Sequence, residues 1–393
     1  MKRSFSLQTG SPVPLLVAST GLIAATYGLI RLAYGLFLPD VQEDLGLGPA
    51  AAGAVSGGAS IMYCVAALVG FFTAARHSRA LVLLAGAAGA AGAAGMAAAG
   101  DATWFAAFAI VGSAGAGLAS PALVAIVQQN PATRGMPRAQ AIVNAGTGPG
   151  LIGAAVLAIL LLPDWRLAWW IAAGATVIVT AAVTALGPRG RPNDDAPAAF
   201  PPPAWFRTHL RPIVAALLMG AGCAAVWNFG RVLLVDAGAG ATVSVLSWGA
   251  IGVGGAAVIV TARWVERMSP ALAWILTTSA IAAATAILPL VPGLTGAAIA
   301  ACVVFGWAYM TGSGALIRWT AALDPDRAPA GTALLFVTLI LGQAVGATVL
   351  GAFIGGAGYP LSFLAAASVA LLAVLPALRG LHPVPLGGDP RGV

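Results

Sequence analysis

Two arginines lie inside apolar stretches that are long enough to cross a membrane. Arg31 and Arg231 stand 200 residues apart, and aliphatic and small residues surround each of them. Placing a guanidinium in the hydrocarbon region costs ~2.5–3.5 kcal/mol on insertion scales, so such a charge usually faces the protein interior or a water-filled cavity. The planar guanidinium fork binds carboxylate or phosphate bidentately. The pair therefore predicts a positively charged binding site for an anion, although snorkelling to a helix end is an open structural alternative.

Aromatic and amide residues near the arginines are further candidates for substrate binding. Tyr27 precedes Arg31 by four residues and Tyr34 follows it by three, so both share its helical face. Trp227 and Asn228 stand in the equivalent place before the second arginine. Each of the four could contact a ligand or contribute only to packing.

Two later segments add candidates with a stronger structural alternative. Trp307 and Tyr309 either stack on a substrate or pack as an aromatic pair. Asn144 and Gln343 are expected to be buried amides, and hydrogen bonding between helices is their default role.

The composition is that of a chain in contact with lipid. Of 393 residues, 60% are hydrophobic and 8% charged, against roughly 25% charged in soluble domains. The apolar runs repeat at about 20 residues, the length that spans a hydrocarbon core. We therefore predict an all-α polytopic membrane protein with twelve transmembrane helices. Cys64, Cys223 and Cys302 fall inside apolar runs without metal-ligand spacing, so we expect packed thiols.

Proline, glycine and charge clusters divide the chain into two sets of six predicted helices. The first half, residues 1–187, has helices at 13–38, 50–73, 80–99, 102–128, 139–162 and 167–187. The second half, residues 212–379, has helices at 212–235, 241–262, 270–290, 295–319, 328–354 and 360–379. The proline-rich segment 188–211 is predicted to be a cytoplasmic linker, and 380–393 a cytoplasmic tail.

The two halves echo each other. Pro12 and Pro212 precede the first helix of each half, and the arginine follows at the same interval. Repeated halves with a substrate site near the midplane, at their interface, are a recurring transporter design.

These features resemble the major facilitator superfamily over essentially the whole chain. Gly70, Arg76 and Arg79 lie in a segment similar to the family's Gly-x-x-x-Asp-Arg-x-Gly-Arg-Arg turn, with Ala74 and His77 in place of Asp and Gly. The resemblance implies the family's fold of two pseudo-symmetric six-helix halves and a conformational role for this turn.

Two more segments carry the resemblance. Gly148, Pro149 and Gly153 are similar to the Gly-Pro-x-x-Gly element of the family's antiporter motif, which implies a hinge in the fifth helix. The first helix resembles branches that transport organophosphates and other organic anions, where arginines on helices 1 and 7 hold the anion. Leu32 replaces the basic residue that often follows the first arginine, which favours a carboxylate over a doubly charged phosphate.

We therefore expect a monomeric secondary or facilitative transporter, not an enzyme, which carries a small organic anion by alternating access. Its partners are the anionic substrate and membrane lipid; no nucleic acid, cofactor or metal is expected. A proton-coupled efflux antiporter for drug-like or metabolite compounds is the alternative, which the Gly148-Pro149 element favours. It is opposed by the acidic residues, all of which we assign to loops or helix ends, with Asp40 in a solvated cluster past the first helix.

Charge bias predicts the topology in a bacterial inner membrane. The chain has 19 basic residues. All except Arg31, Arg231 and Arg166 fall in the two termini, in the linker, or in loops on the same side of the membrane as the linker. This bias places the linker and both termini in the cytoplasm. In a variant without the native cysteines, a cysteine placed in the 188–211 segment should react with an impermeant maleimide only after the cells are opened. Labelling in intact cells would reverse the orientation.

Overall fold

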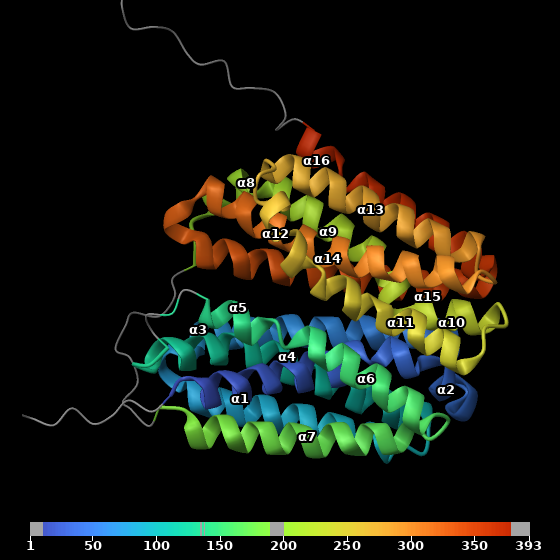
Figure 1. Cartoon of the computed structure of the whole chain (residues 1–393), viewed down its shortest axis with the longest axis horizontal. Coiled ribbons are helices and arrows are strands. Elements are labelled where there is room, and N and C mark those ends of the chain that lie inside the picture. Colours follow the sequence, from blue (N-terminus) through green and yellow to red (C-terminus); the bar gives the residue numbers. More distant parts are fainter. Residues whose placement is uncertain (1–10, 134–135, 137, 189–199, 379–393) are drawn as a thin grey trace, which may run out of the picture.

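The chain folds into two helical bundles that lie against each other (Figure 1). A computed structural model describes residues 11–133, 136, 138–188 and 200–378, and these residues form helices without a strand among them. The first bundle contains α1 to α7 and the second contains α9 to α16 (Figure 1). The predicted tail 380–393, residues 189–199 of the predicted linker and several basic residues of the topology argument lie outside the described residues.

The helix that carries the arginine is interrupted in the same way in each half. Each begins as an α-helix, passes through a π-helical segment and continues as an α-helix. The segments are α1 (Val13–Ile23), η1 (Ala24–Leu32) and α2 (Tyr34–Leu45), then α9 (Leu210–Ala224), η2 (Ala225–Phe229) and α10 (Gly230–Asp236). π-Helical turns are rare and are frequent at functional sites. The repeat seen in the sequence thus extends to an unusual backbone feature beside each arginine.

Two helices are far longer than a membrane is thick. Helix α3 (Pro49–Ala97) has 49 residues and α15 (Ala328–Leu372) has 45. At ~1.5 Å per residue each exceeds twice a ~30 Å hydrocarbon core. Each contains one non-helical position, His77 in α3 and Gly358, with φ 74°, in α15. The predicted breaks at 74–79 and 355–359 are therefore single-residue kinks, which corrects the helix ends given above.

The remaining helices lie close to the predicted ranges, but two of the predicted helices are interrupted, between α5 and α6 and between α11 and α12. Nine of the described helices are long and apolar enough to cross a membrane, or ten if α11 and α12, bent by 43°, form one span. The all-α polytopic class is confirmed, and the exact number of twelve stays a prediction that the two kinks support. The helices are α4 (Ala102–Gln129), α5 (Ala139–Asn144), α6 (Thr147–Leu161), α7 (Trp165–Leu186), α11 (Ala241–Ala256), α12 (Val258–Val265), α13 (Pro270–Leu290), α14 (Thr295–Leu323) and α16 (Leu375–Leu378).

The described end of the predicted linker has regular structure. Residues Pro203–Thr208 form the short helix α8, and α9 begins at Leu210. Trp205 of α8 is buried and donates a hydrogen bond from its indole nitrogen to Asp324 at 2.9 Å. An apolar residue inside the linker thus fixes it to the end of α14, which the proline-rich composition did not indicate.

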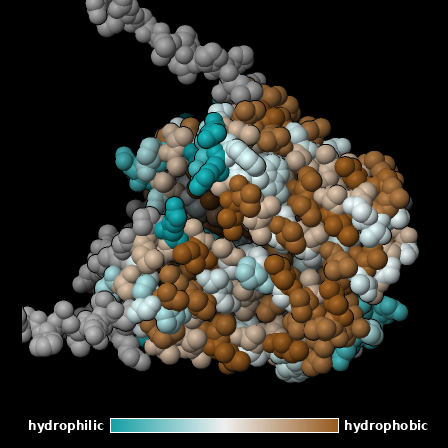
Figure 2. Space-filling view, in the orientation of Figure 1, coloured by the Kyte–Doolittle hydropathy of each residue, from teal (hydrophilic) through white to brown (hydrophobic). Residues whose placement is uncertain are grey.

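The outer surface is mostly apolar. Figure 2 shows hydrophobic side chains over most of the visible face, with hydrophilic ones gathered toward the two ends of the bundles. Aliphatic side chains such as Leu160, Ile178 and Ile259 are largely exposed, which is the pattern of a surface in contact with lipid.

Close backbone contacts hold the two halves together. Helix α3 packs along α15, and α6 along α11. At the end of the bundle away from the linker, a Cβ on Gly35 would lie 1.9 Å from the carbonyl oxygen of Trp227, so only glycine fits there. Within the first half, a Cβ on Gly28 would lie 2.4 Å from the Cα of Gly150, so α6 lies directly against the π segment. Small residues permit this spacing in lipid.

Candidate functional site

A small cavity lies between the two halves. Both halves contribute polar side chains to its wall. The first half supplies Arg31, Ser60 and Ser113, and the second supplies Trp227, Asn228 and Gln343.

Arg31 contacts only neutral groups. Its Nη2 lies 3.4 Å from the Ser60 hydroxyl and 3.3 Å from the Gln343 amide oxygen, both longer than a typical hydrogen bond of ~2.9–3.0 Å. Its Cζ lies 4.7 Å from the ring centre of Tyr63, a cation–π distance. Its Nε is buried and has no hydrogen-bond partner among the described residues. Among the ion pairs of the described residues, none includes Arg31, so its positive charge has no carboxylate partner.

Gln343 connects Arg31 to the aromatic residues behind the wall. Its amide nitrogen donates to the Tyr309 hydroxyl at 3.0 Å. The Tyr309 ring meets Trp227 edge-on at 5.3 Å and therefore supports the wall from outside. The predicted pairing of Tyr309 with Trp307 does not occur, because residues two apart on a helix face different directions. Trp307 instead donates to the Thr261 hydroxyl at 2.8 Å.

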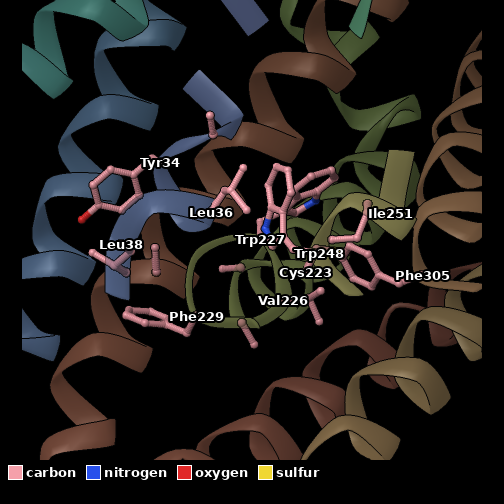
Figure 3. Packing of buried hydrophobic residues seen from close by; sticks show 14 of the residues in the cluster. Tyr34, Leu36, Leu38, Cys223, Val226, Trp227, Phe229, Trp248, Ile251 and Phe305 are labelled. Atoms are coloured by element: carbon pink, nitrogen blue, oxygen red, sulfur yellow. The ribbon is translucent and has the colours of Figure 1, made fainter. Parts of the chain in front are cut away.

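Neither predicted tyrosine offers a free hydroxyl to the cavity. Tyr34 lines the wall with its ring, and its hydroxyl donates to the carbonyl of Ala52 at 2.9 Å. In Figure 3 that hydroxyl points away from Trp227. Tyr27 shares a hydrogen bond of 2.8 Å with the hydroxyl of Tyr63 and thereby steadies the ring beneath Arg31.

Asn228 and Trp227 bring the second π segment to the wall. Ser56 donates across the interface to the amide oxygen of Asn228 at 2.5 Å, and the amide nitrogen donates to the carbonyl of Ala224. Trp227 lies beside Trp248, with ring centres 6.3 Å apart (Figure 3). The indole N–H of Trp227 is buried and finds no hydrogen-bond partner in the part of the chain that the structure describes.

Arg231 does not reach this cavity. It is 2% exposed and forms an ion pair with Asp40, and it donates to the Leu36 carbonyl at 2.5 Å and from Nε to Ser244 at 3.2 Å. The sequence predicts that Arg31 and Arg231 form one site, but the structure does not bring them together. The reason is Asp40: it lies inside α2 with its side chain 17% exposed, not in a solvated cluster.

The fifth helix differs from its prediction. Asn144 is exposed at the end of α5 and accepts a hydrogen bond from Gln140 at 3.0 Å, so it is not a buried amide. The predicted helix is interrupted between α5 and α6, just before Gly148 and Pro149. Pro149 stands in the first turn of α6, where a missing N–H costs little. Gly153 packs near the side chain of Leu29 on the first helix.

The turn candidates lie outside the cavity wall. Gly70 packs against Pro121 of α4, and a Cβ there would lie 2.4 Å from the proline ring. Arg76 is exposed, and Arg79 donates to the carbonyl of Pro188 at 3.4 Å.

Sequence reasoning missed the residues that α3 and α4 contribute. Ser56, Ser60 and Tyr63 are spaced four and three residues apart, so they share one helical face. That spacing was a readable signal. Ser113, on α4, stands alone among small residues and carried none.

The Arg231–Asp40 pair predicts a characteristic pattern of stability. Removing one partner of a buried pair costs on the order of 3–5 kcal/mol because the other charge is left unpaired. Asp40→Asn and Arg231→Gln should each lower the melting temperature of the purified protein, and the double variant should recover much of the loss. Additive losses would mean that the two side chains are not coupled. Arg166→Gln, whose pair with Asp44 is partly exposed, is the control and should have a smaller effect.

Comparisons with known proteins agree with this architecture. A model of the Major Facilitator Superfamily matches residues 20–327. The fold is similar to a crystal structure of a mutant of the nucleoside transporter NupG, with a TM-score of 0.78 and 14% identity over 94% of this chain and 100% of that one. It is also similar to a POT family transporter in complex with 5-aminolevulinic acid, with a TM-score of 0.72 and 13% identity over 92% of this chain and 94% of that one.

No curated protein matches the sequence. The structural likenesses, at such low identity, concern the fold alone. The family model, however, covers most of the residues, including both π segments and the cavity wall up to α14. The chain therefore belongs to the major facilitator superfamily and is a multi-pass transmembrane transporter.

Proposed function

We propose that this transporter carries a small organic monoanion, of the carboxylate type, and that Arg31 binds its charge. The observation that carries the proposal is the uncompensated guanidinium on the cavity wall. Arg31 has long contacts to two neutral acceptors and a buried Nε without a partner. A carboxylate offers two oxygens in the geometry that a guanidinium fork binds.

The electrostatics of the wall favour a single negative charge. Among the described residues that line the wall, Arg31 is the one with a charged side chain, and Arg231 is neutralised by Asp40. A second negative charge on the ligand would enter a partly dehydrated site without a counter-charge, which is costly.

Alternating access follows from the way the halves are joined. The Arg231–Asp40 ion pair and the contact of Gly35 with Trp227 tie the halves at the end away from the linker. In this state we expect the ligand to exchange through the linker end, which the charge bias assigns to the cytoplasm. Opening the other end requires that the Arg231–Asp40 pair separate.

Arg31→Lys should strongly weaken anion binding, because lysine keeps the charge but loses the planar fork. Truncating one side of a buried charged contact costs ~2–5 kcal/mol, which is roughly 30-fold or more in affinity. The ligand is first chosen from a panel of short carboxylates, sugar acids, phosphates and cationic drugs by the rise in melting temperature. Its affinity for the variants is then measured by titration calorimetry.

Arg166→Lys is the matched control, because Arg166 pairs with Asp44 outside the cavity, and it should keep the native affinity. Unchanged affinity in Arg31→Lys would contradict the role of Arg31. A panel in which only cationic compounds stabilise the protein would contradict the anion class itself.

One observation favours the alternative, a proton-coupled antiporter. Asp40 is a largely buried carboxylate at the interface of the halves, where a proton would release Arg231 and loosen the tie. In proteoliposomes this alternative predicts that a protonophore abolishes accumulation and that Asp40→Asn abolishes the effect of the gradient. Under the primary proposal, counterflow exchange of the anion continues when the proton gradient is dissipated.

A further inference from the structure

The cavity wall contains hydrogen-bond donors that a carboxylate at Arg31 leaves unused. Most polar side chains of the wall are already paired. Ser56 donates to Asn228, Asn228 to a backbone carbonyl, Gln343 to Tyr309, and Tyr34 to the carbonyl of Ala52. Apart from Arg31 itself, Trp227 and Ser113 are the wall residues whose buried polar atom has no partner among the described residues.

The indole N–H of Trp227 is the stronger of the two signals. An indole nitrogen only donates, and a buried tryptophan usually finds an acceptor for it. The ring cannot turn toward one, because it is 4% exposed and packed against Trp248, Phe305 and Tyr309. Because Trp227 lines the cavity, a ligand bound there is the candidate acceptor for this nitrogen.

Ser113 supplies a second donor from the opposite half. Hydroxyls inside helices commonly bond the carbonyl four residues earlier, as Thr26 does to Leu22 at 2.8 Å and Thr176 to Ala172 at 2.7 Å. Ser113 makes no such bond although it is 1% exposed. The cavity thus offers a donor from α4 and a donor from η2 besides the guanidinium.

We infer that the transported monoanion carries an uncharged acceptor oxygen in addition to its carboxylate, as a hydroxy- or oxo-monocarboxylate does. Trp227 and Ser113 would bind that oxygen and set the specificity. The inference rests on the proposed function, since Arg31 must hold the carboxylate. The oxygen is uncharged because no second cation lines the wall. A ligand without it would leave both donors buried and unpaired, which is what a site built for hydrogen bonding discriminates against.

The test compares matched ligands on the full-length protein. The affinity for butyrate is compared with the affinities for 2-, 3- and 4-hydroxybutyrate, which differ from it only by the added oxygen, and for 2-oxobutyrate, in which a carbonyl replaces a CH₂ group. At least one oxygenated acid should bind about 3- to 10-fold more tightly than butyrate, the value of one neutral hydrogen bond. Trp227→Phe and Ser113→Ala should each lower that ratio, by weakening the oxygenated acid and not butyrate.

Two matched control variants separate recognition from packing. Trp248 and Ser247 also have buried polar atoms without partners, but neither lines the cavity. Trp248→Phe and Ser247→Ala should therefore keep the native ratio. Equal affinities for butyrate and all its oxygenated analogues, or an unchanged ratio in both Trp227→Phe and Ser113→Ala, would overturn the inference while leaving the anion site intact. Absence of binding by every carboxylate would instead reject the proposed function.

Discussion

A guanidinium keeps its charge at any physiological pH, so a fold that removes it from water must compensate it. The two arginines of this chain meet that requirement differently. Arg231 is compensated within the protein, by the carboxylate of Asp40, a backbone carbonyl and a hydroxyl. Arg31 is left with a serine, an amide and an aromatic ring. The first arrangement ties the halves together, and the second leaves a positive charge at the edge of a cavity.

Both arrangements depend on contacts that cross between the halves. Arg31 lies between Ser60 of the first half and Gln343 of the second, so a ligand that displaces or strengthens either contact changes the relation of the halves. Ser56 and Asn228 form a similar link beside it. A ligand shifts a conformational equilibrium only through such differential contacts. A site built from both halves is therefore suited to couple binding to their relative motion.

The helices could be predicted because a lipid environment requires long apolar segments. The two arginines could be recognised as candidate functional residues because they are charged residues within such segments. The breaks within α3 and α15 were predicted at the right places, but their extent was not, since the residues around His77 remain helical. The partners of the arginines were not predictable either. Gln343 reaches Arg31 only because α15 packs on α3. Asp40 is largely buried because α2 continues to Leu45 and packs against the second half. Such contacts depend on tertiary register, which sequence spacing does not encode.

The different fates of the arginines can nevertheless be traced to one position of the repeat. Arg31 and Arg231 are 200 residues apart, and Asp40, the partner of Arg231, comes from the first half. The same offset places the counterpart of Asp40 at residue 240, which is a glycine directly before the first residue of α11. The second half therefore has no carboxylate at the place from which it could neutralise Arg31. If both arginines formed such ion pairs, both sides of the interface would be closed and no charge would remain for a substrate. Because one carboxylate is missing, one ion pair joins the halves and one guanidinium stays available.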